Sequence, residues 1–138
     1  MGRLKAFLNA WGPALIWMAF IFYLSAQSQL PAVPEGWLDT LFKKSAHFLV
    51  YAVLGRLYLR ALGFYPRRPV PPAGLALVLA ALYAVTDEFH QAFVPGRTPR
   101  LTDWLIDCAG AATGLWVGGL LRRGPLAAGG GRPKGDLP

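Results

Sequence analysis

Two long runs without a charged residue set the limits on what this chain can fold into. The first extends from Ala6 to Pro34 and the second from Val70 to Thr86, and both are largely apolar. An α-helix needs about 20 mainly apolar residues to cross a bilayer. Because only helices and closed barrels satisfy their backbone hydrogen bonds in lipid, runs of this length predict membrane-spanning helices. The composition agrees, since 15% of the residues are charged, against about 25% in soluble domains.

We therefore expect an all-α protein, a four-helix transmembrane bundle that forms one domain over residues 1–123. The first apolar run is longer than a signal-peptide core and has no clear cleavage site after it, which favours an uncleaved helix. Pro13 lies inside this run and is expected to kink the helix. Residues 124–138 are rich in glycine and proline, which predicts a disordered cytoplasmic tail. The expected helices cover about residues 7–25, 45–62, 70–93 and 101–121.

The basic residues indicate how such a bundle lies in the membrane. If the N-terminus is cytoplasmic, ten of the 14 Lys and Arg residues fall on the cytoplasmic side. The positive-inside rule therefore predicts cytoplasmic N- and C-termini in a multi-pass protein of the cell membrane. The net charge is +7, but the basic residues form short groups between apolar runs, so we expect no nucleic-acid partner. The ten residues are Arg3, Lys5, Arg56, Arg60, Arg67, Arg68, Arg122, Arg123, Arg132 and Lys134.

Short rows of polar residues lie on the second and third expected helices. Residues three or four positions apart share one face of a helix. Lys44, His47 and Tyr51 form one such row, and Asp87 forms another with Gln91. In the predicted topology both rows lie near the extracytoplasmic boundary of the membrane.

A third row lies on the fourth expected helix. It begins with Asp103 and Asp107 and continues through Gly110, Gly114 and Gly118. Glycines at this spacing let a neighbouring helix approach closely. The two carboxylates on the same face should therefore point into the bundle and away from lipid.

The segment VPGRTPR, between the third and fourth expected helices, predicts a tight turn with special dihedral angles at Gly96. The turn gives Arg97 a fixed position, which suits a bidentate contact with a carboxylate or a phosphate. Each polar feature also has an ordinary explanation, such as an interfacial His47 or a helix cap at Asp103. Their concentration at one level of a small bundle favours a functional polar site over a purely structural network.

Three segments resemble the VanZ-like membrane proteins: FKKSAHFLVYAVLG, YAVTDEFHQAFVPGR and LTDWLIDCAGAATG. They occur in the family's order within residues 41–118. The resemblance implies a role in the cell envelope, because the family's namesake is associated with resistance to the glycopeptide teicoplanin. Two positions depart from the family's pattern: Lys43 stands where the family has Asp, and Asp107 where it has Asn. Carried over by position, the resemblance points to Lys44, His47, Tyr51, Asp87, Glu88, His90, Gln91, Arg97, Asp103 and Gly110.

The first functional hypothesis is an outward-facing pocket that binds an anionic membrane lipid or a lipid-linked envelope precursor. Lys44, His47 and Arg97 would be the cationic groups of this pocket. The expected binding residues also include Asp107 and the other polar residues named in the preceding paragraph.

The alternative is a membrane-embedded enzyme acting on a lipid or lipid-linked phosphate. Glu88 or Asp87 would then be the general base, and His47 the acid or nucleophile. A small transporter or a subunit of a larger complex also stays open. No recognised ligand spacing is present, so we expect neither a metal nor another cofactor. A divalent metal is nevertheless a variant of the enzyme hypothesis, with candidate ligands Asp87, Glu88, His90, Asp103 and Asp107. The glycine row permits a homo-oligomer without requiring one.

Overall fold

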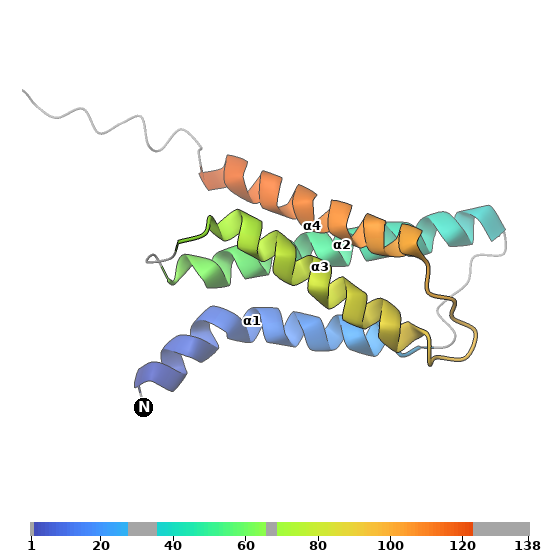
Figure 1. The fold of residues 1–138 in the computed structure, drawn as a ribbon, viewed down its shortest axis with the longest axis horizontal. Coiled ribbons are helices and arrows are strands. Elements are labelled where there is room, and N and C mark those ends of the chain that lie inside the picture. The colour runs from blue at the N-terminus through green and yellow to red at the C-terminus, as the bar shows by residue number, and fades with distance from the viewer. Residues whose placement is uncertain (1, 28–35, 66–68, 123–138) are drawn as a thin grey trace, which may run out of the picture.

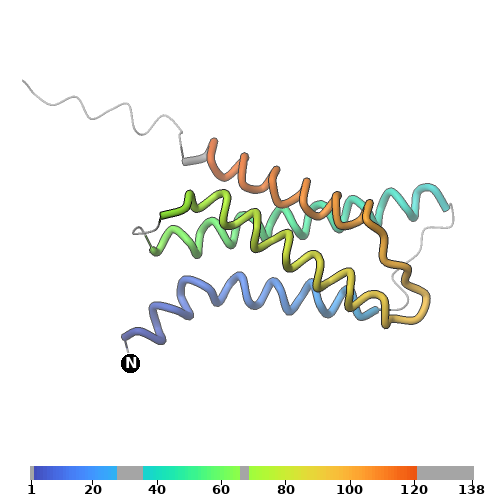
Figure 2. Tube along the Cα trace, in the orientation of Figure 1, coloured from blue at the N-terminus to red at the C-terminus, as the bar shows by residue number. Residues whose placement is uncertain are grey.

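The computed structural model describes residues 2–27, 36–65 and 69–122, and these residues form four helices and no strand. Helices α1 and α3 run in one direction along the bundle, and α2 and α4 run in the other (Figures 1 and 2). The predicted all-α helical bundle is thus confirmed, whereas the predicted disordered tail lies outside the described residues. The helices are α1 (Gly2–Ser25), α2 (Gly36–Gly63), α3 (Pro72–Gln91) and α4 (Leu101–Arg122).

The helix bounds differ from the expected ones mainly in α2, which begins at Gly36 instead of near residue 45. The apolar run was a poor guide to this start because Asp39, Lys43 and Lys44 interrupt the apolar residues of the first turns. They are stabilised within the helix instead, by an ion pair of 2.6 Å between Lys43 and Asp39, one turn apart. The hydroxyl of Thr40 also donates to the carbonyl of Gly36. The helix therefore continues beyond the segment that the hydrophobic pattern marks.

Helices α1 and α3 are each long and apolar enough to cross a membrane. All four helices also expose large apolar side chains, among them Ile16, Leu49, Leu82 and Trp116. Soluble monomers rarely expose apolar surface to this extent. The fold therefore suggests a membrane protein. That all four helices cross the membrane, and that both termini are cytoplasmic, stays a prediction.

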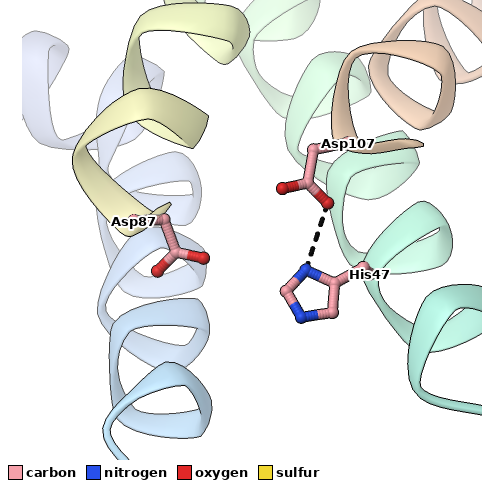
Figure 3. Close-up of side chains that lie close together, drawn as sticks. All are labelled: His47, Asp87 and Asp107. Carbon is pink, nitrogen blue, oxygen red and sulfur yellow. Dashed lines mark hydrogen bonds and ion pairs between the residues drawn. The ribbon is translucent and has the colours of Figure 1, made fainter. Parts of the chain in front are cut away.

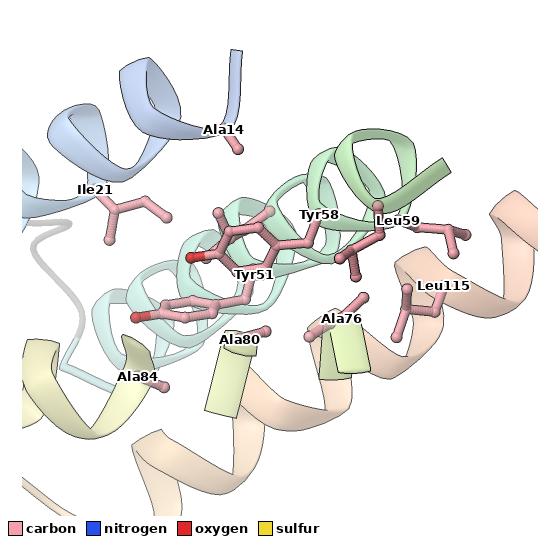
Figure 4. Close-up of a cluster of buried hydrophobic side chains, with 12 residues drawn as sticks. Ala14, Ile21, Tyr51, Tyr58, Leu59, Ala76, Ala80, Ala84 and Leu115 are labelled. Carbon is pink, nitrogen blue, oxygen red and sulfur yellow. The ribbon is translucent and has the colours of Figure 1, made fainter. Parts of the chain in front are cut away.

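The core is a set of buried stripes, one along each helix (Figure 4). On α3 the stripe consists of Ala76, Ala80 and Ala84, which are small and let the larger side chains of α2 fill the centre. This stripe continues into Asp87 and Gln91, which are also buried. We call the end of the bundle where α1 and α3 finish and α2 and α4 begin the polar end. There the apolar stripe of α3 gives way to buried polar groups.

Helices α2 and α4 have the most extensive helix–helix contact in the bundle. A Cβ atom added to Gly110 would collide with the carbonyl of Phe48, and one added to Gly114 would collide with the carbonyl of Ala52. Only glycine allows backbones to lie this close. The close approach predicted from the glycine row is therefore confirmed. We call this contact the glycine seam: Gly110 and Gly114 of α4 lie against the backbone of Phe48 and Ala52 of α2, and Gly118 lies against the side chain of Arg56.

Pro13 lies inside α1, and the first part of that helix bends away from the rest (Figure 1). Proline has no backbone N–H and its ring crowds the carbonyl four residues earlier, so the carbonyl of Asn9 loses its partner in the helix. The guanidinium of Arg60 donates to that carbonyl at 3.0 Å and to the carbonyl of Ala10 at 3.2 Å. The predicted kink is present, and α2 supplies the missing donor.

Candidate functional site

Three side chains from three helices meet at the polar end (Figure 3). His47 comes from α2, Asp87 from α3 and Asp107 from α4, and each offers one ligand atom within 4.8 Å of the others. The Nδ1 atom of His47 lies 3.1 Å from Oδ1 of Asp107. Asp87 and Asp107 are only 2% and 0% exposed. We call these three residues the His47 cluster.

A chain of hydrogen bonds fixes the position of Asp87. Gln91, one turn later on α3, donates from Nε2 to Oδ2 of Asp87 at 3.2 Å. The same nitrogen also lies 3.4 Å from the hydroxyl of Ser25, the last residue of α1. Sequence reasoning missed Ser25, because a serine at the end of an apolar run is usually an ordinary boundary residue. These hydrogen bonds link α1 to the His47 cluster and fix the position of one carboxylate oxygen of Asp87.

A cavity of about 270 Å³ lies beside the cluster. His47 and Gln91 form part of its wall. Lys44 of α2 and Asp103 of α4 also line it, and Nζ of Lys44 lies 3.2 Å from Oδ1 of Asp103. We call it the polar cavity. Its charged wall residues are Lys43, Lys44, Arg97, Arg100, Asp39 and Asp103.

A second cavity of about 270 Å³ lies between α1 and α2 and is almost entirely apolar. We call it the apolar cavity. Its apolar wall residues are Ile21, Leu24, Phe42, Ala46 and Val50. It shares three residues with the polar cavity, namely Lys43, His47 and Arg97. An amphiphilic ligand could therefore occupy both cavities at once.

Arg97 connects the two cavities but makes a different contact from the expected one. Its Nε atom donates to the carbonyl of Gln27 at 3.2 Å, and its Nη2 atom to the carbonyl of Leu24 at 3.3 Å. These carbonyls lie at the C-terminal end of α1 and just beyond it, and the carbonyl of Leu24 also accepts from the backbone N–H of Gln27 at 3.2 Å. The turn places Arg97 as predicted, with Gly96 at φ 81°. Within the described residues, however, the guanidinium binds backbone carbonyls and no carboxylate.

The VanZ/LLP1 family model matches residues 10–122, which is most of the chain. The chain belongs to the VanZ/LLP1 family. The match covers the His47 cluster and both cavities, and it confirms the resemblance found in the three sequence segments. Comparisons with curated proteins and with solved structures gave no match.

The two departures from the VanZ pattern both lie at the polar end. Lys43 pairs with Asp39 on the same helix, so the basic residue at this position has an acidic partner one turn earlier. Asp107 pairs with His47, so the extra carboxylate of this family member lies inside the cluster. Both substitutions thus change the charge of the region that we consider functional.

Glu88 and His90, which are among the predicted site residues, lie outside both the polar cavity and the His47 cluster. Oε2 of Glu88 accepts a hydrogen bond of 3.0 Å from the backbone N–H of Arg100, and the side chain borders a third cavity beside Trp104. The ring of His90 stacks on Phe22 of α1, with centroids 4.1 Å apart. The two are roughly 200° apart around a helix of 100° per residue, so they face different neighbours. The structure does not bring either residue into the His47 cluster.

Proposed function

We propose that this VanZ/LLP1 member is an integral membrane protein that binds an anionic amphiphile at the polar end. The ligand is a membrane lipid or a lipid-linked precursor of the cell envelope. One observation carries the proposal: a charged cavity and an apolar cavity adjoin through Lys43, His47 and Arg97. A headgroup in the polar cavity and a hydrocarbon chain in the apolar cavity would occupy both.

The charges of the polar cavity favour an anionic headgroup. Four cationic side chains line it against two carboxylates. The carboxylates are engaged by the lysines, because Asp39 lies 2.6 Å from Lys43 and Asp103 lies 3.2 Å from Lys44. Among the described residues, neither arginine of the cavity has an ion-pair partner. Arginine recognises phosphate through two parallel N–H groups, so a phosphate-containing headgroup would suit the excess positive charge of the cavity.

The apolar cavity suits a hydrocarbon chain. Phe42, Ala46 and Val50 of α2 face Ile21 and Leu24 of α1 across it. Each buried CH₂ group of a lipid chain contributes about 0.8 kcal/mol to binding. A few methylenes in this cavity would therefore add substantially to the attraction of the headgroup.

The headgroup part of the proposal is tested by neutralising Arg100, whose side chain is exposed and whose loss should leave the fold intact. The probes are phosphatidylglycerol and a polyprenyl phosphate, with phosphatidylcholine as the zwitterionic reference, and native mass spectrometry measures bound lipid. We expect Arg100→Gln to lower binding of both anionic probes at least about tenfold, since a desolvated charge contact contributes 1.4 kcal/mol or more. Arg3→Gln, at the start of α1 and far from the polar end, is the control. Equal binding by both variants would exclude this cavity as the headgroup site.

The chain part of the proposal is tested by filling the apolar cavity. Ala46 borders this cavity, and Ala46→Phe places a ring in the space that the chain would occupy. We expect weaker binding of the long-chain probes and unchanged binding of a water-soluble phosphate ester. Ala112→Phe adds the same ring at an exposed position of α4 and is the control. If Ala46→Phe binds long-chain lipid normally, the chain lies elsewhere.

The His47–Asp107 hydrogen bond favours a second candidate function, an enzyme that acts on a lipid or lipid-linked phosphate. A carboxylate that accepts from one ring nitrogen orients the other nitrogen for proton transfer or attack. His47 borders both cavities, where the phosphate of an amphiphile would lie. Phosphate release from a polyprenyl phosphate that disappears in His47→Gln would support catalysis. Because Glu88 lies outside the His47 cluster and Asp87 belongs to it, Glu88→Gln should retain more of that activity than Asp87→Asn. Stoichiometric binding without any turnover would support the binding function and argue against catalysis.

The role in the cell envelope is also part of the proposal. It rests on the association of the family's namesake with teicoplanin resistance and on the chemistry of the two cavities. We expect cells that express the protein to tolerate more teicoplanin than cells that express Arg100→Gln at the same level. If cells with equal amounts of the two proteins in the membrane were equally susceptible to teicoplanin, binding at this site would not be the cause of resistance.

A further inference from the structure

The His47 cluster contains more buried acceptor atoms than the protein satisfies. Oδ1 of Asp87 and Oδ2 of Asp107 are buried and have no hydrogen-bond partner among the described residues, and the same is true of the Tyr51 hydroxyl. Each carboxylate has one partnered oxygen, bound by Gln91 or by His47. Buried polar atoms are normally paired, and an unpaired one points to a missing ion or water.

We propose that His47, Asp87 and Asp107 bind a divalent transition-metal ion, with Zn²⁺ as the reference ion. This inference goes beyond the proposed amphiphile binding and does not depend on it. It also reverses the expectation of no metal, which rested on local sequence spacing.

The donor set and its dimensions fit such an ion. A ring nitrogen and two carboxylate oxygens form a mixed N/O set, which suits zinc or manganese better than the all-oxygen preference of magnesium or calcium. The three ligand atoms lie within 4.8 Å of one another. Tetrahedral ligands bound at about 2.1 Å lie about 3.4 Å apart, so the most distant pair of ligand atoms needs to close by up to about 1.4 Å. Rotamer adjustments of this size need no movement of the helices.

The charge balance of the buried site also favours a divalent ion. Two carboxylates buried at 2% and 0% exposure cost several kcal/mol each unless they are neutralised. A protonated His47 offsets only one of the two negative charges. A neutral imidazole, two carboxylates and a divalent cation sum to zero. The metal would therefore neutralise the site and supply a partner for both unsatisfied oxygens.

The surrounding residues resemble the outer partners of a metal site. Gln91 holds the second oxygen of Asp87, and Ser25 in turn contacts Gln91. Hydrogen bonds of this kind orient metal ligands and raise affinity. Tyr51 lies one turn after His47 on α2, and its side chain points back toward the polar end, as helical side chains do (Figure 4). Its buried hydroxyl lies within electrostatic reach of both carboxylates.

The experiment uses the full chain purified in detergent, freed of metal with a chelator and kept without added lipid. Co²⁺ titration followed by visible absorption, and elemental analysis after Zn²⁺ loading, measure affinity and stoichiometry. We expect one ion per chain, and at least about tenfold weaker binding in His47→Gln and Asp107→Asn. Asp103→Asn, one turn earlier on α4 and paired with Lys44, is the matched control and should bind like the parent chain.

The parent chain alone provides a result that does not depend on how the variants fold. Substoichiometric zinc after loading of the parent chain would overturn the inference. So would equal metal affinity in the parent chain, His47→Gln and Asp107→Asn. Asp107→Asn introduces the residue that the family usually has at this position, so its fold should be intact. Its helicity and elution volume check that. Lipid binding is measured separately, so failure here leaves the proposed function standing.

Discussion

The pair of helices α2 and α4 is held together in two different ways along its length. At the polar end the contacts join charged side chains, with Lys44 against Asp103 and His47 against Asp107. One turn further along the pair, the contact is between the backbones of the two helices, beginning where Gly110 lies against Phe48. The same two helices thus carry the chemistry of the site at one end and close packing at the other.

The difference between these regions shows where stability and function are separated. Ion pairs near the surface contribute about 0–1 kcal/mol, and buried pairs often gain no more than their desolvation costs. The glycine seam has no such cost, and it fixes the axial register of α4 against α2. We infer that the seam keeps Asp103 and Asp107 aligned with their partners on α2. Binding at the polar end then depends on this alignment. Substitutions at the two ends should therefore have different consequences.

The largest effect is expected in the glycine seam. Gly114→Ala places a methyl group against the carbonyl of Ala52, and backbone cannot move aside as a side chain can. We expect a loss of about 3 kcal/mol, the upper end of overpacking costs, measured as a lower thermal midpoint in detergent.

Gly119→Ala is a control five residues later on the same helix. Nothing lies within 4 Å of its added Cβ. Replacing glycine by alanine in a helix stabilises it by up to about 1 kcal/mol, so the midpoint should rise or stay unchanged. Equal losses at Gly114 and Gly119 would show that the seam does not hold the pair together.

The next effect concerns the two acids of α4. Asp107→Ala removes the acceptor of His47 inside the bundle, which should cost about 2 kcal/mol when a chelator is present. Asp103→Ala removes a partner of Lys44 at a side chain that is 27% exposed, and should cost less than about 1 kcal/mol. Chemical unfolding of both variants in the same detergent measures the contrast. Losses of similar size would mean that burial does not distinguish the two pairs.

A smaller effect is expected at the turn that joins the polar end to α1. Arg97→Lys keeps the charge but loses the forked donation to the carbonyls of Leu24 and Gln27. We expect a loss of about 1 kcal/mol, with faster hydrogen exchange in the last turn of α1. Arg100→Lys, in the same loop but without such contacts, should change stability by less than about 0.5 kcal/mol. An unchanged exchange rate in Arg97→Lys would argue against a capping role.

The smallest effect on stability is expected from Lys43→Asp, which introduces the usual family residue. It replaces an ion pair with Asp39 by a like-charge pair one turn apart, at a cost of about 0.5 kcal/mol. Binding of phosphatidylglycerol should nevertheless fall much more than stability, because the polar cavity loses one positive charge and gains one negative charge. Normal lipid binding together with normal stability would place the headgroup away from Lys43.

Much of the helical architecture could be predicted from the sequence, because it depends on local patterns. Uncharged runs marked α1 and α3, and glycines every fourth residue marked the close face of α4. Residue spacing also placed Lys44, His47 and Tyr51 on one side of α2. These predictions need only the geometry of a single helix. The start of α2 at Gly36 was missed because charged residues interrupt the apolar residues of its first turns.

The site itself could be predicted only in part, because its geometry depends on contacts between helices. The grouping of His47, Asp87 and Asp107 involves one residue from each of three helices, so no local spacing reveals it. Glu88 and His90 are neighbours of Asp87 in sequence, yet they face other surroundings. The binding of Arg97 to the end of α1 and the part played by Ser25 likewise require knowledge of where α1 ends.

The glycine seam also determines which part of the bundle can move. Because backbone rests directly on backbone there, α2 and α4 form a rigid body that cannot separate without losing its whole interface. Helix α1 contacts α2 and α3 but has no interface with α4 among the described residues. The apolar cavity lies between α1 and α2, so widening it requires a movement of α1 relative to the α2–α4 pair, and such a movement would leave the ion pairs between α2 and α4 unchanged.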